Sequence, residues 1–292
     1  MIKELLSPKQ VAQALGVSES SLKRWCDQGL IATIRTGGGH RRLALPDVLR
    51  FIRDGEHRLV SPEALGLPPV REISERCLER ARDLLAQALL DGDEPLSRRI
   101  VFDLYLAKHS LSSICDEVVA AAFREIGERW SCQQAEVYQE RRACEIMLRM
   151  LHSLRETQHG MAPEWRAIGG TPEGDSYLIP NAMVELVLRE TGWSAVSLGA
   201  SIPFESYAAA VRAHRPRLVW LSVSHIPDLE AFVAGYQQLY EVAQTHRTAI
   251  VVGGQGLSSV VRQRIRYASY CDTVRHLEEF ARTMRSMGGG GT

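Results

Sequence analysis

The segment Ser18–Leu43 constrains the fold of this 292-residue chain more than any other stretch. Ser18 is a residue type that favours the N-cap of a helix, and Leu22 and Trp25 then fall on one face of the helix that follows. A strand-like run, Leu30–Arg35, comes after a glycine and leads into a turn of three consecutive glycines, which lets the backbone reverse tightly. The segment therefore predicts a helix followed by a β-hairpin with a narrow tip.

Hydroxyl and basic side chains gather on the helix face opposite Leu22 and Trp25, and again at the hairpin tip. Such side chains bind the phosphates and base edges of duplex DNA, and the glycine turn projects the tip as a wing. A small solvated helix followed by a basic hairpin is the alternative, but the order of helix, strand, glycine turn and Arg pair favours a winged helix. The predicted DNA contacts are Ser18, Ser20, Ser21, Lys23, Arg24, Arg35, His40, Arg41 and Arg42.

The charge of the chain is unevenly distributed. The whole chain has 35 Lys and Arg and 35 Asp and Glu, whereas residues 1–58 have ten Lys and Arg and six Asp and Glu. This local excess of four positive charges is modest, but it has the sign that a duplex-binding module needs. The remainder carries the compensating negative charge, so we expect DNA contact only at the N-terminal end.

Several classes of protein are disfavoured by the composition. No run of about 18 apolar residues occurs, so the sequence predicts neither a membrane span nor a membrane partner. The N-terminus lacks a secretory signal pattern, and the expected location is the cytoplasm. Six cysteines are scattered without Cys-x-x-Cys spacing, which argues against a disulfide framework and predicts no metal site.

Helical segments on both sides of the DNA-binding stretch define a first domain, residues 1–70. Ser7 and Pro8 begin a helix before the stretch, and Pro46 starts another that continues through Arg53. The stretch Ser61–Val70 contains three prolines and is interpreted as a linker. We therefore expect a winged helix-turn-helix over residues 1–70.

Residues 71–160 are expected to be entirely helical. Apolar residues recur at helical spacing in three series, which begin at Cys77, Ile114 and Cys144. Asp91–Asp93 interrupts the first gap, and Ser113 with Asp116 has the spacing of a capping box. Four helices packed as a bundle are the simplest architecture for such a segment.

From Pro163 onwards, short apolar runs alternate with amphipathic segments of helical length. This alternation predicts a Rossmann-like, doubly wound parallel sheet over residues 161–288, followed by a flexible tail at 289–292. In such a sheet, ligands bind at the loops beyond the carboxyl ends of the strands. The expected strands are 166–168, 195–198, 218–223 and 249–252, and the expected helices are 181–191, 204–214, 228–244, 257–266 and 277–287.

The DNA-binding segment resembles that of MerR-type transcription regulators. Pro8–Trp25 matches their helix-turn-helix, Gly29–Ile31 their Gly-Leu-Ile exit, and Gly38–Arg42 their Gly-Gly-His-Arg-Arg wing. The resemblance covers roughly the first 70 residues. It implies a sequence-specific regulator that binds an operator in double-stranded DNA.

The order of a winged helix, a four-helix segment and a Rossmann-like domain resembles one subgroup, the cobalamin-dependent photoreceptor repressors of the CarH type. Their last two domains resemble the cap and corrinoid-binding domains of methionine synthase. The resemblance implies a homodimer or homotetramer whose sensory half controls assembly and DNA affinity. It also implies an Asp-x-His-x-x-Gly motif whose His ligates cobalt, and Ser-x-Ser/Thr and Gly-Gly motifs that line the slot for the nucleotide tail of the cofactor.

The corrinoid motif is degenerate in this chain. Asp175 is present, but Tyr177 stands at the His position and Pro180 replaces the glycine. A phenol, protonated at neutral pH, is a weaker cobalt donor than imidazole, and proline restricts the turn at which the tail enters. The later elements are retained as Ser222-Val223-Ser224 and Gly253-Gly254.

The cap motif is altered as well. The subgroup has a Trp followed, after nine residues, by Glu-His over the upper face of the corrin, whereas this chain has Trp130 and Glu140-Arg141. Arg141 brings a permanent cation, which suits an anionic or carboxylated ligand. Helix-end packing of Trp130, core capping by Tyr177 and an ordinary turn at Gly253–Gly254 are alternatives. The resemblance assigns ligand-facing positions to Trp130, Glu140, Arg141, Asp175, Tyr177, Ser222, Ser224, Gly253 and Gly254.

The sequence predicts what the chain binds on DNA better than it predicts which ligand or stimulus the chain senses. We expect a DNA-binding transcriptional repressor and not an enzyme, because no acid–base pair or nucleophile constellation accompanies the wing. One hypothesis is that His-ligated cobalamin binding is lost, and that another small molecule, a chromophore such as another tetrapyrrole, or no ligand occupies the cleft. A second keeps adenosylcobalamin and light sensing without the axial His. A third, disfavoured, is a corrinoid-carrying enzyme subunit.

Overall fold

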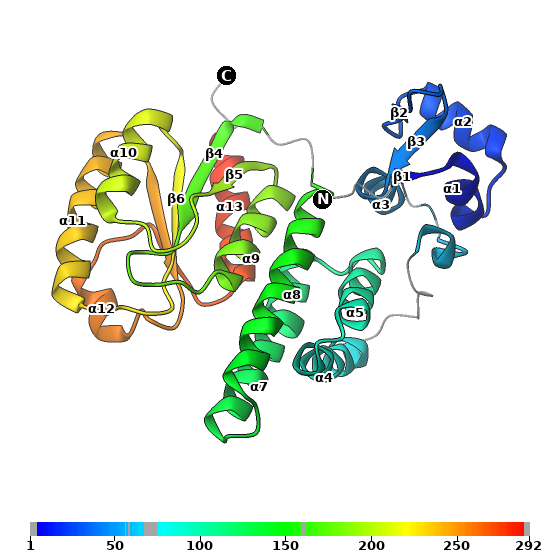
Figure 1. Ribbon diagram of the computed structural model, residues 1–292. Coiled ribbons are helices and arrows are strands. Elements are labelled where there is room, and N and C mark those ends of the chain that lie inside the picture. The colour runs from blue at the N-terminus through cyan, green and yellow to red at the C-terminus, as the bar shows by residue number, and fades with distance from the viewer. Residues whose placement is uncertain (1–4, 56, 58, 67–74, 159–161, 289–292) are drawn as a thin grey trace. The chain divides into compact units, whose positions relative to one another are not determined.

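The computed structural model describes residues 5–55, 57, 59–66, 75–158 and 162–288 (Figure 1). The chain divides into two compact units, Met1–Thr157 and Gln158–Thr292. The domain boundaries expected near residues 70 and 160, and the expected tail 289–292, lie outside the described residues and stay predictions.

Two capped helices begin the first unit. The hydroxyl of Ser7 accepts a hydrogen bond from the Gln10 amide at 3.3 Å, and the Gln10 side chain accepts one from the Ser7 amide at 2.9 Å. This capping box starts α1 (Pro8–Leu15). Gly16, with a φ of 64°, then turns the chain into α2 (Glu19–Asp27) through the left-handed region that favours glycine. The predicted helix-turn-helix is confirmed.

A three-stranded antiparallel sheet carries the wing, in the order β1 (Leu5–Leu6), β3 (Arg41–Ala44), β2 (Ile34–Arg35). α3 (Leu45–Asp54) follows β3 directly. The strand expected over 30–35 is confined to its last two residues, because only these pair with β3. The pairing of β1 was not predicted, since two residues are too short to give a periodic signal.

The expected linker 61–70 is structured in its first half. The amides of Val60 and Ser61 donate to the carbonyl of Ala14 at 2.8 and 3.0 Å. A single 3-10 turn, η1 (Pro62–Leu65), follows, and Leu65 is buried. The linker interpretation is therefore wrong for 61–66, because this stretch packs on the end of α1. Residues 67–70 lie outside the described part of the chain.

Within its described residues, the helical segment forms the expected bundle of four helices, if the continuous run α6–η2–α7 is taken as one helix. The third of these helices is continuous and consists of α6, a π-helical turn η2, and α7. It begins at Ser110, whose hydroxyl accepts a hydrogen bond from the Ser113 amide at 3.1 Å, so the capping box predicted at Ser113 is wrong. The elements are α4 (Glu75–Asp91), α5 (Glu94–Leu106), α6 (Leu111–Ser113), η2 (Ile114–Val119), α7 (Ala120–Ser131) and α8 (Val137–Arg155).

The second unit is the expected doubly wound parallel sheet, with strand order β5-β4-β6-β7-β8. Figure 1 shows α10 and α11 on one face and α9 and α13 on the other. The strands are β4 (Ala162–Gly170), β5 (Trp193–Ser197), β6 (Leu218–Ser222), β7 (Ala249–Gly253) and β8 (Ser269–Cys271). The helices are α9 (Ile179–Glu190), α10 (Phe204–His214), α11 (Leu229–Thr245), α12 (Ser259–Arg264) and α13 (Val274–Gly288).

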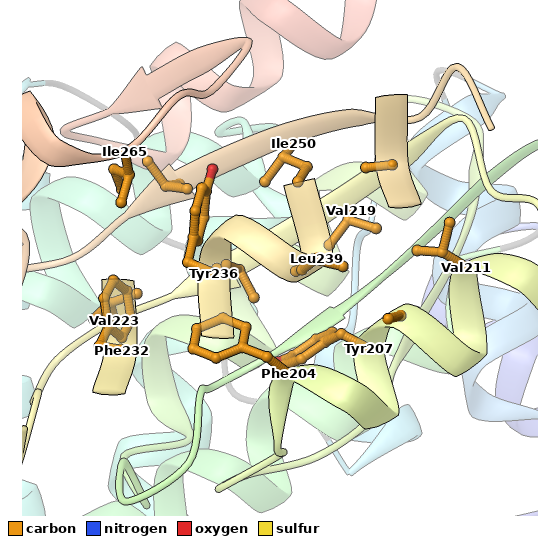
Figure 2. Close-up of a cluster of buried hydrophobic side chains, with 14 of the residues drawn as sticks. Phe204, Tyr207, Val211, Val219, Val223, Phe232, Tyr236, Leu239, Ile250 and Ile265 are labelled. Atoms are coloured by element: carbon orange, nitrogen blue, oxygen red, sulfur yellow. The ribbon is translucent and has the colours of Figure 1, made fainter. Parts of the chain in front are cut away.

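Alternate side chains of each strand supply two separate apolar cores. On β6, Val219 and Leu221 join the core under α10 and α11 (Figure 2), while Leu218 and Trp220 join the core under α9 and α13. Because the strands are parallel, their carboxyl ends meet at one edge of the sheet. The loops that carry the predicted corrinoid motifs all leave from that edge.

Candidate DNA interface and cobalamin-binding-like site

The helix α2 exposes several of the predicted DNA contacts. Ser20, Lys23 and Arg24 are exposed. Ser18 and Ser21 also serve the helix itself, because the Ser18 hydroxyl accepts a hydrogen bond from the Ser21 amide at 3.1 Å and lies 3.0 Å from the Ser21 hydroxyl. The cationic part of this face is therefore Lys23 and Arg24.

One of the three arginines of the wing, Arg41, binds it to α2. The Arg41 guanidinium donates to the Asp27 carboxylate at 2.7 Å and to the Lys23 carbonyl at 3.4 Å. A carboxylate at the C-terminal end of a helix opposes the helix dipole unless a cation lies beside it, so Asp27 is the sequence signal for this pair. Arg41, predicted as a DNA contact, thus has a partner within the protein.

The other predicted wing residues remain accessible. Arg35 and His40 are exposed, and Arg42 is half-buried in register with Ile34 on the neighbouring strand. Gly39, with a φ of 76°, forms the turn that the glycines predict. Four cations and the imidazole, on α2 and on the wing, thus belong to two elements that the Arg41–Asp27 pair joins: Lys23, Arg24, Arg35, His40 and Arg42.

Three rings that sequence reasoning did not group together support α2 from beneath. Trp25 lies 5.3 Å from Phe51 and 4.9 Å from His57, measured between ring centroids, and Phe51 stacks on His57 at 4.4 Å. Phe51 belongs to α3, so this contact fixes α2 against the helix that follows the wing. Aromatic contacts of this kind add to the stabilisation from burial.

In the helical segment, the predicted ligand-facing residues lie where α7 ends and α8 begins. The Trp130 side chain has 50% of its surface exposed, so it is not the packed helix end that the sequence left as an alternative. Glu140 is half-buried and Arg141 is exposed. Tyr138, 63% exposed, lies under the Arg142 guanidinium, 5.8 Å from its ring centroid. This end of the segment therefore exposes two aromatic rings.

In the second unit, Asp175 joins two of the loops at the carboxyl edge of the sheet. It is buried, and its carboxylate accepts hydrogen bonds from the amides of Tyr177 at 3.0 Å, Ser224 at 2.5 Å and His225 at 3.2 Å. The backbone of Asp175 accepts from the Thr171 hydroxyl and from the Ser201 amide. The acid of the motif therefore has hydrogen-bond partners within the chain itself.

The remaining motif residues form close contacts between loops. Ser222 is buried and Ser224 is half-buried. A Cβ on Gly254, whose φ is 112°, would lie 2.2 Å from the Val223 carbonyl oxygen, and the Val223 amide donates to the Gly253 carbonyl at 2.8 Å. The glycine pair thus lets the ends of β6 and β7 touch, which is the turn role that the sequence left open.

These residues do not fit a cobalamin held by an axial histidine. Tyr177 is half-buried beside Asp175, and Pro180 sits in the first turn of α9, where proline starts a helix without loss because it needs no amide donor there. Among the described residues, no group of three or more His, Cys, Asp or Glu side chains is arranged to hold a metal ion. None of the described helices is both long and apolar enough to cross a membrane.

Comparison with protein families gives two matches. Residues 5–56 match the model of a helix-turn-helix domain, and residues 81–155 match the model of a B12 binding domain. The chain joins a helix-turn-helix domain to a B12 binding domain. This is the organisation of a DNA-binding regulator with a cobalamin-binding-like sensor.

The chain is similar to a transcriptional repressor and to corrinoid proteins. The HTH-type transcriptional repressor CarA of Myxococcus xanthus is 24% identical over 258 residues, covering 85% of this chain and 86% of that protein. Trimethylamine corrinoid protein 1 of Methanosarcina acetivorans is 21% identical over 184 residues, 62% of this chain and 83% of that protein. The solved structure of the Methanosarcina barkeri monomethylamine corrinoid protein superposes with a TM-score of 0.60 at 16% identity, over 70% of this chain and 98% of that one. The structural match confirms the fold alone.

Proposed function

We propose that this chain is a MerR-type DNA-binding transcriptional repressor that works as a homodimer or homotetramer in the cytoplasm. One observation carries the proposal: the Arg41–Asp27 pair fixes the wing to α2, so that both basic elements present one rigid surface. Rigid placement matters because phosphate contacts set the register from which other side chains reach the bases. The length over which the chain matches a transcriptional repressor supports the same function.

In the proposed surface, α2 and the wing contact different parts of the DNA duplex. Lys23 and Arg24, with Ser20, meet the major groove, since an exposed helix of this kind fits there. Arg35, His40 and Arg42 on the wing meet the phosphates or the adjacent groove. Ser18 and Ser21 contribute through the start of the helix, and Arg41 acts by positioning the wing.

The second half is proposed to sense a ligand, light or a partner without His-ligated cobalamin. Support comes from Tyr177 at the expected ligand position and from the Asp175 carboxylate, which already accepts three backbone amides. Catalysis is not part of the proposal, and a corrinoid-carrying enzyme subunit is disfavoured because the helix-turn-helix domain has no place in it.

The DNA-binding part is tested by selection from a random duplex pool, followed by gel shifts on the enriched sequence and a scrambled one. We expect the chain to prefer the enriched duplex, and a Lys23→Ala/Arg42→Ala variant to lose that complex. Arg80→Ala/Arg124→Ala, which removes two exposed cations from the helical segment, is the charge-matched control and should bind as the wild type does. Equal binding to enriched and scrambled duplexes would remove sequence-specific regulation.

A further inference from the structure

The face of the sheet that carries Ser222 and Gly253 also carries a large buried side chain. Side chains alternate along a strand, so Ser222 lies on the same face of β6 as Trp220. Gly253 is paired with Ser222 across β6 and β7, and Trp220 is paired with Gly169 on β4. In the corrinoid-binding resemblance, the Ser-x-Ser and Gly-Gly motifs line the slot for the nucleotide tail. Trp220 therefore lies directly below the mouth of that slot.

The indole of Trp220 fills the space beneath the motifs. The side chain is 1% exposed and belongs to the core under α9 and α13. A Cβ on Gly169 would lie 2.1 Å from Trp220 Cδ2, so the indole ring occupies the space that is free because Gly169 of β4 has no side chain. No residue with a side chain could stand at Gly169 while the indole keeps this position.

Polar contacts hold the ring from the helix side. Trp220 Nε1 donates to Asn181 Oδ1 at 2.8 Å, and Asn181 Nδ2 donates to Ser197 Oγ at 2.7 Å. Asn181 is 2% exposed and lies on α9, three residues into the helix that Pro180 helps to start. The buried amide is thereby satisfied by two partners from the chain, and α9 is tied to β5 and β6.

We propose that Trp220 is a built-in substitute for the base of a corrinoid's nucleotide arm, and that it closes the slot to that arm. The base of cobalamin is 5,6-dimethylbenzimidazole, a fused five- and six-membered ring system of nearly the same size and shape as indole. Trp220 supplies such a ring, with its polar atom on Asn181, from within the chain. The second unit is thus complete without the tail, and any stimulus acts on it by another route.

The first test uses the unmodified full-length chain and its tryptophan indole signals in a nitrogen–proton NMR spectrum. The chain has five tryptophans, and loss of one signal in Trp220→Phe assigns the relevant peak. We expect this peak to exchange slowly with heavy water, because its hydrogen bond is buried, and to stay in place when excess hydroxocobalamin is added. A saturable shift of the Trp220 peak, or its rapid exchange, would overturn the proposal.

The second test opens the slot. Trp220→Ala leaves a cavity beneath Ser222 that is lined by the apolar core and by the Asn181 side-chain amide, and buried apolar cavities bind small aromatic molecules. We expect 5,6-dimethylbenzimidazole, and also its ribonucleoside, to raise the melting temperature of Trp220→Ala saturably and to leave the wild type unchanged. The ribonucleoside is decisive, because its ribose must extend past Ser222 and Gly253, on the α9 face of the sheet, towards the carboxyl edge. Adding Asn181→Leu should reduce both gains.

Trp193→Ala is the matched control. Trp193 is equally buried in the same core, but it lies at the start of β5 and donates to the Ala281 carbonyl at 3.3 Å. Trp193 is at the amino end of its strand, away from Ser222 and Gly253 at the carboxyl ends of theirs, so the ribonucleoside should not stabilise this variant. If Trp220→Ala also responds only to the free base, its cavity is an ordinary hole and the proposal fails. Operator binding is measured separately, so a failure here leaves the proposed DNA-binding function untouched.

Discussion

Arg41 Nη2 lies 2.7 Å from Asp27 Oδ1 and joins the tip strand of the wing to the last turn of α2. The arginine keeps 25% of its side-chain surface exposed and the aspartate 63%, so the pair is open to solvent. Exposed ion pairs contribute little to the free energy of unfolding. The pair is therefore more important for the alignment of two DNA-facing elements than for stability.

Asp27→Ala is the sharpest test of that alignment. The change removes a negative charge from the DNA-binding domain, which by itself favours binding to phosphate. We nevertheless expect weaker operator binding, because Arg41 loses its partner and the wing loses its register, with the urea midpoint of unfolding almost unchanged. Gel shifts on the enriched duplex measure the first and circular dichroism the second. Tighter operator binding by Asp27→Ala would contradict the positioning role.

Arg24 distinguishes base reading from phosphate contact. Arg24→Ala should cost about 1–3 kcal/mol of binding free energy on the enriched duplex, and much less on a scrambled one, if the side chain reads a base. A phosphate contact instead lowers binding to both duplexes alike and reduces the salt slope by about one unit. Titrations at several salt concentrations separate the two. Unchanged binding to both duplexes would place Arg24 outside the interface.

The response to adenosylcobalamin tests the degenerate motif. We expect no stoichiometric binding in the dark and no change in oligomeric state on illumination, because Tyr177 offers a phenol in place of an imidazole. Tyr177→His alone should not restore binding, since Pro180 still replaces the glycine of the motif and Arg141 still replaces the His of the cap motif. Spectroscopic titration followed by size-exclusion chromatography in the dark and after light measures both. Tight binding with light-dependent dissociation would contradict this interpretation.

Asp175 should be needed for the stability of the second unit. Asp175→Ala leaves the partly buried amides of Tyr177, Ser224 and His225 without their acceptor. An unsatisfied buried group costs about 1–3 kcal/mol, and we expect a loss at the lower end of that range because water reaches part of this loop. Asp175→Asn keeps one acceptor oxygen and should be milder. Urea unfolding followed by near-ultraviolet circular dichroism measures the loss. Glu173→Ala, an exposed acid of the same loop, is the control, and an equal effect from it would contradict the assignment.

Two cysteines of the helical segment should react at different rates. Burial disfavours the thiolate of Cys144 and raises its pKa to about 11, whereas Cys132 is exposed. With iodoacetamide at pH 8, we expect Cys132 to be alkylated first and Cys144 to react more slowly. The Cys144 rate should rise tenfold for each pH unit up to about 11. Mass spectrometry of quenched samples measures both rates, with Cys132→Ser as the control.

Local patterns were enough to predict most of the fold. The helix Phe204–His214 was predicted at its observed bounds, because its apolar spacing and its flanking prolines are both local signals. β8 was missed, since Ser269–Cys271 is too short to form a pattern. The helix expected to begin at Asn181 begins two residues earlier, at Ile179, because proline is accepted in a first turn.

The candidate sites were less predictable, because their decisive contacts join residues far apart in sequence. Arg41 was expected to face DNA, but its partner Asp27 lies on another element. The carboxylate at the C-terminal end of α2 signals that a cation lies nearby, but it does not identify Arg41 as that cation. The sequence pattern predicted Trp220 only as part of an apolar strand. Its contact with Asn181 arises from the packing of α9 on the sheet. Composition and spacing could place Tyr177 at the motif, but they could not reveal that Asp175 is already satisfied.

The hydrogen bonds from Val60 and Ser61 to the Ala14 carbonyl determine where the DNA-binding domain can be cut. The match to a helix-turn-helix domain stops at residue 56, yet the η1 turn and the buried Leu65 close the end of α1 beyond that point. A fragment ending at residue 56 would lose the turn that packs on α1 and leave the Ala14 carbonyl without these donors. A fragment ending at Gly66 keeps the η1 turn, and it is the shortest fragment to prepare for studies of operator binding by the DNA-binding domain alone.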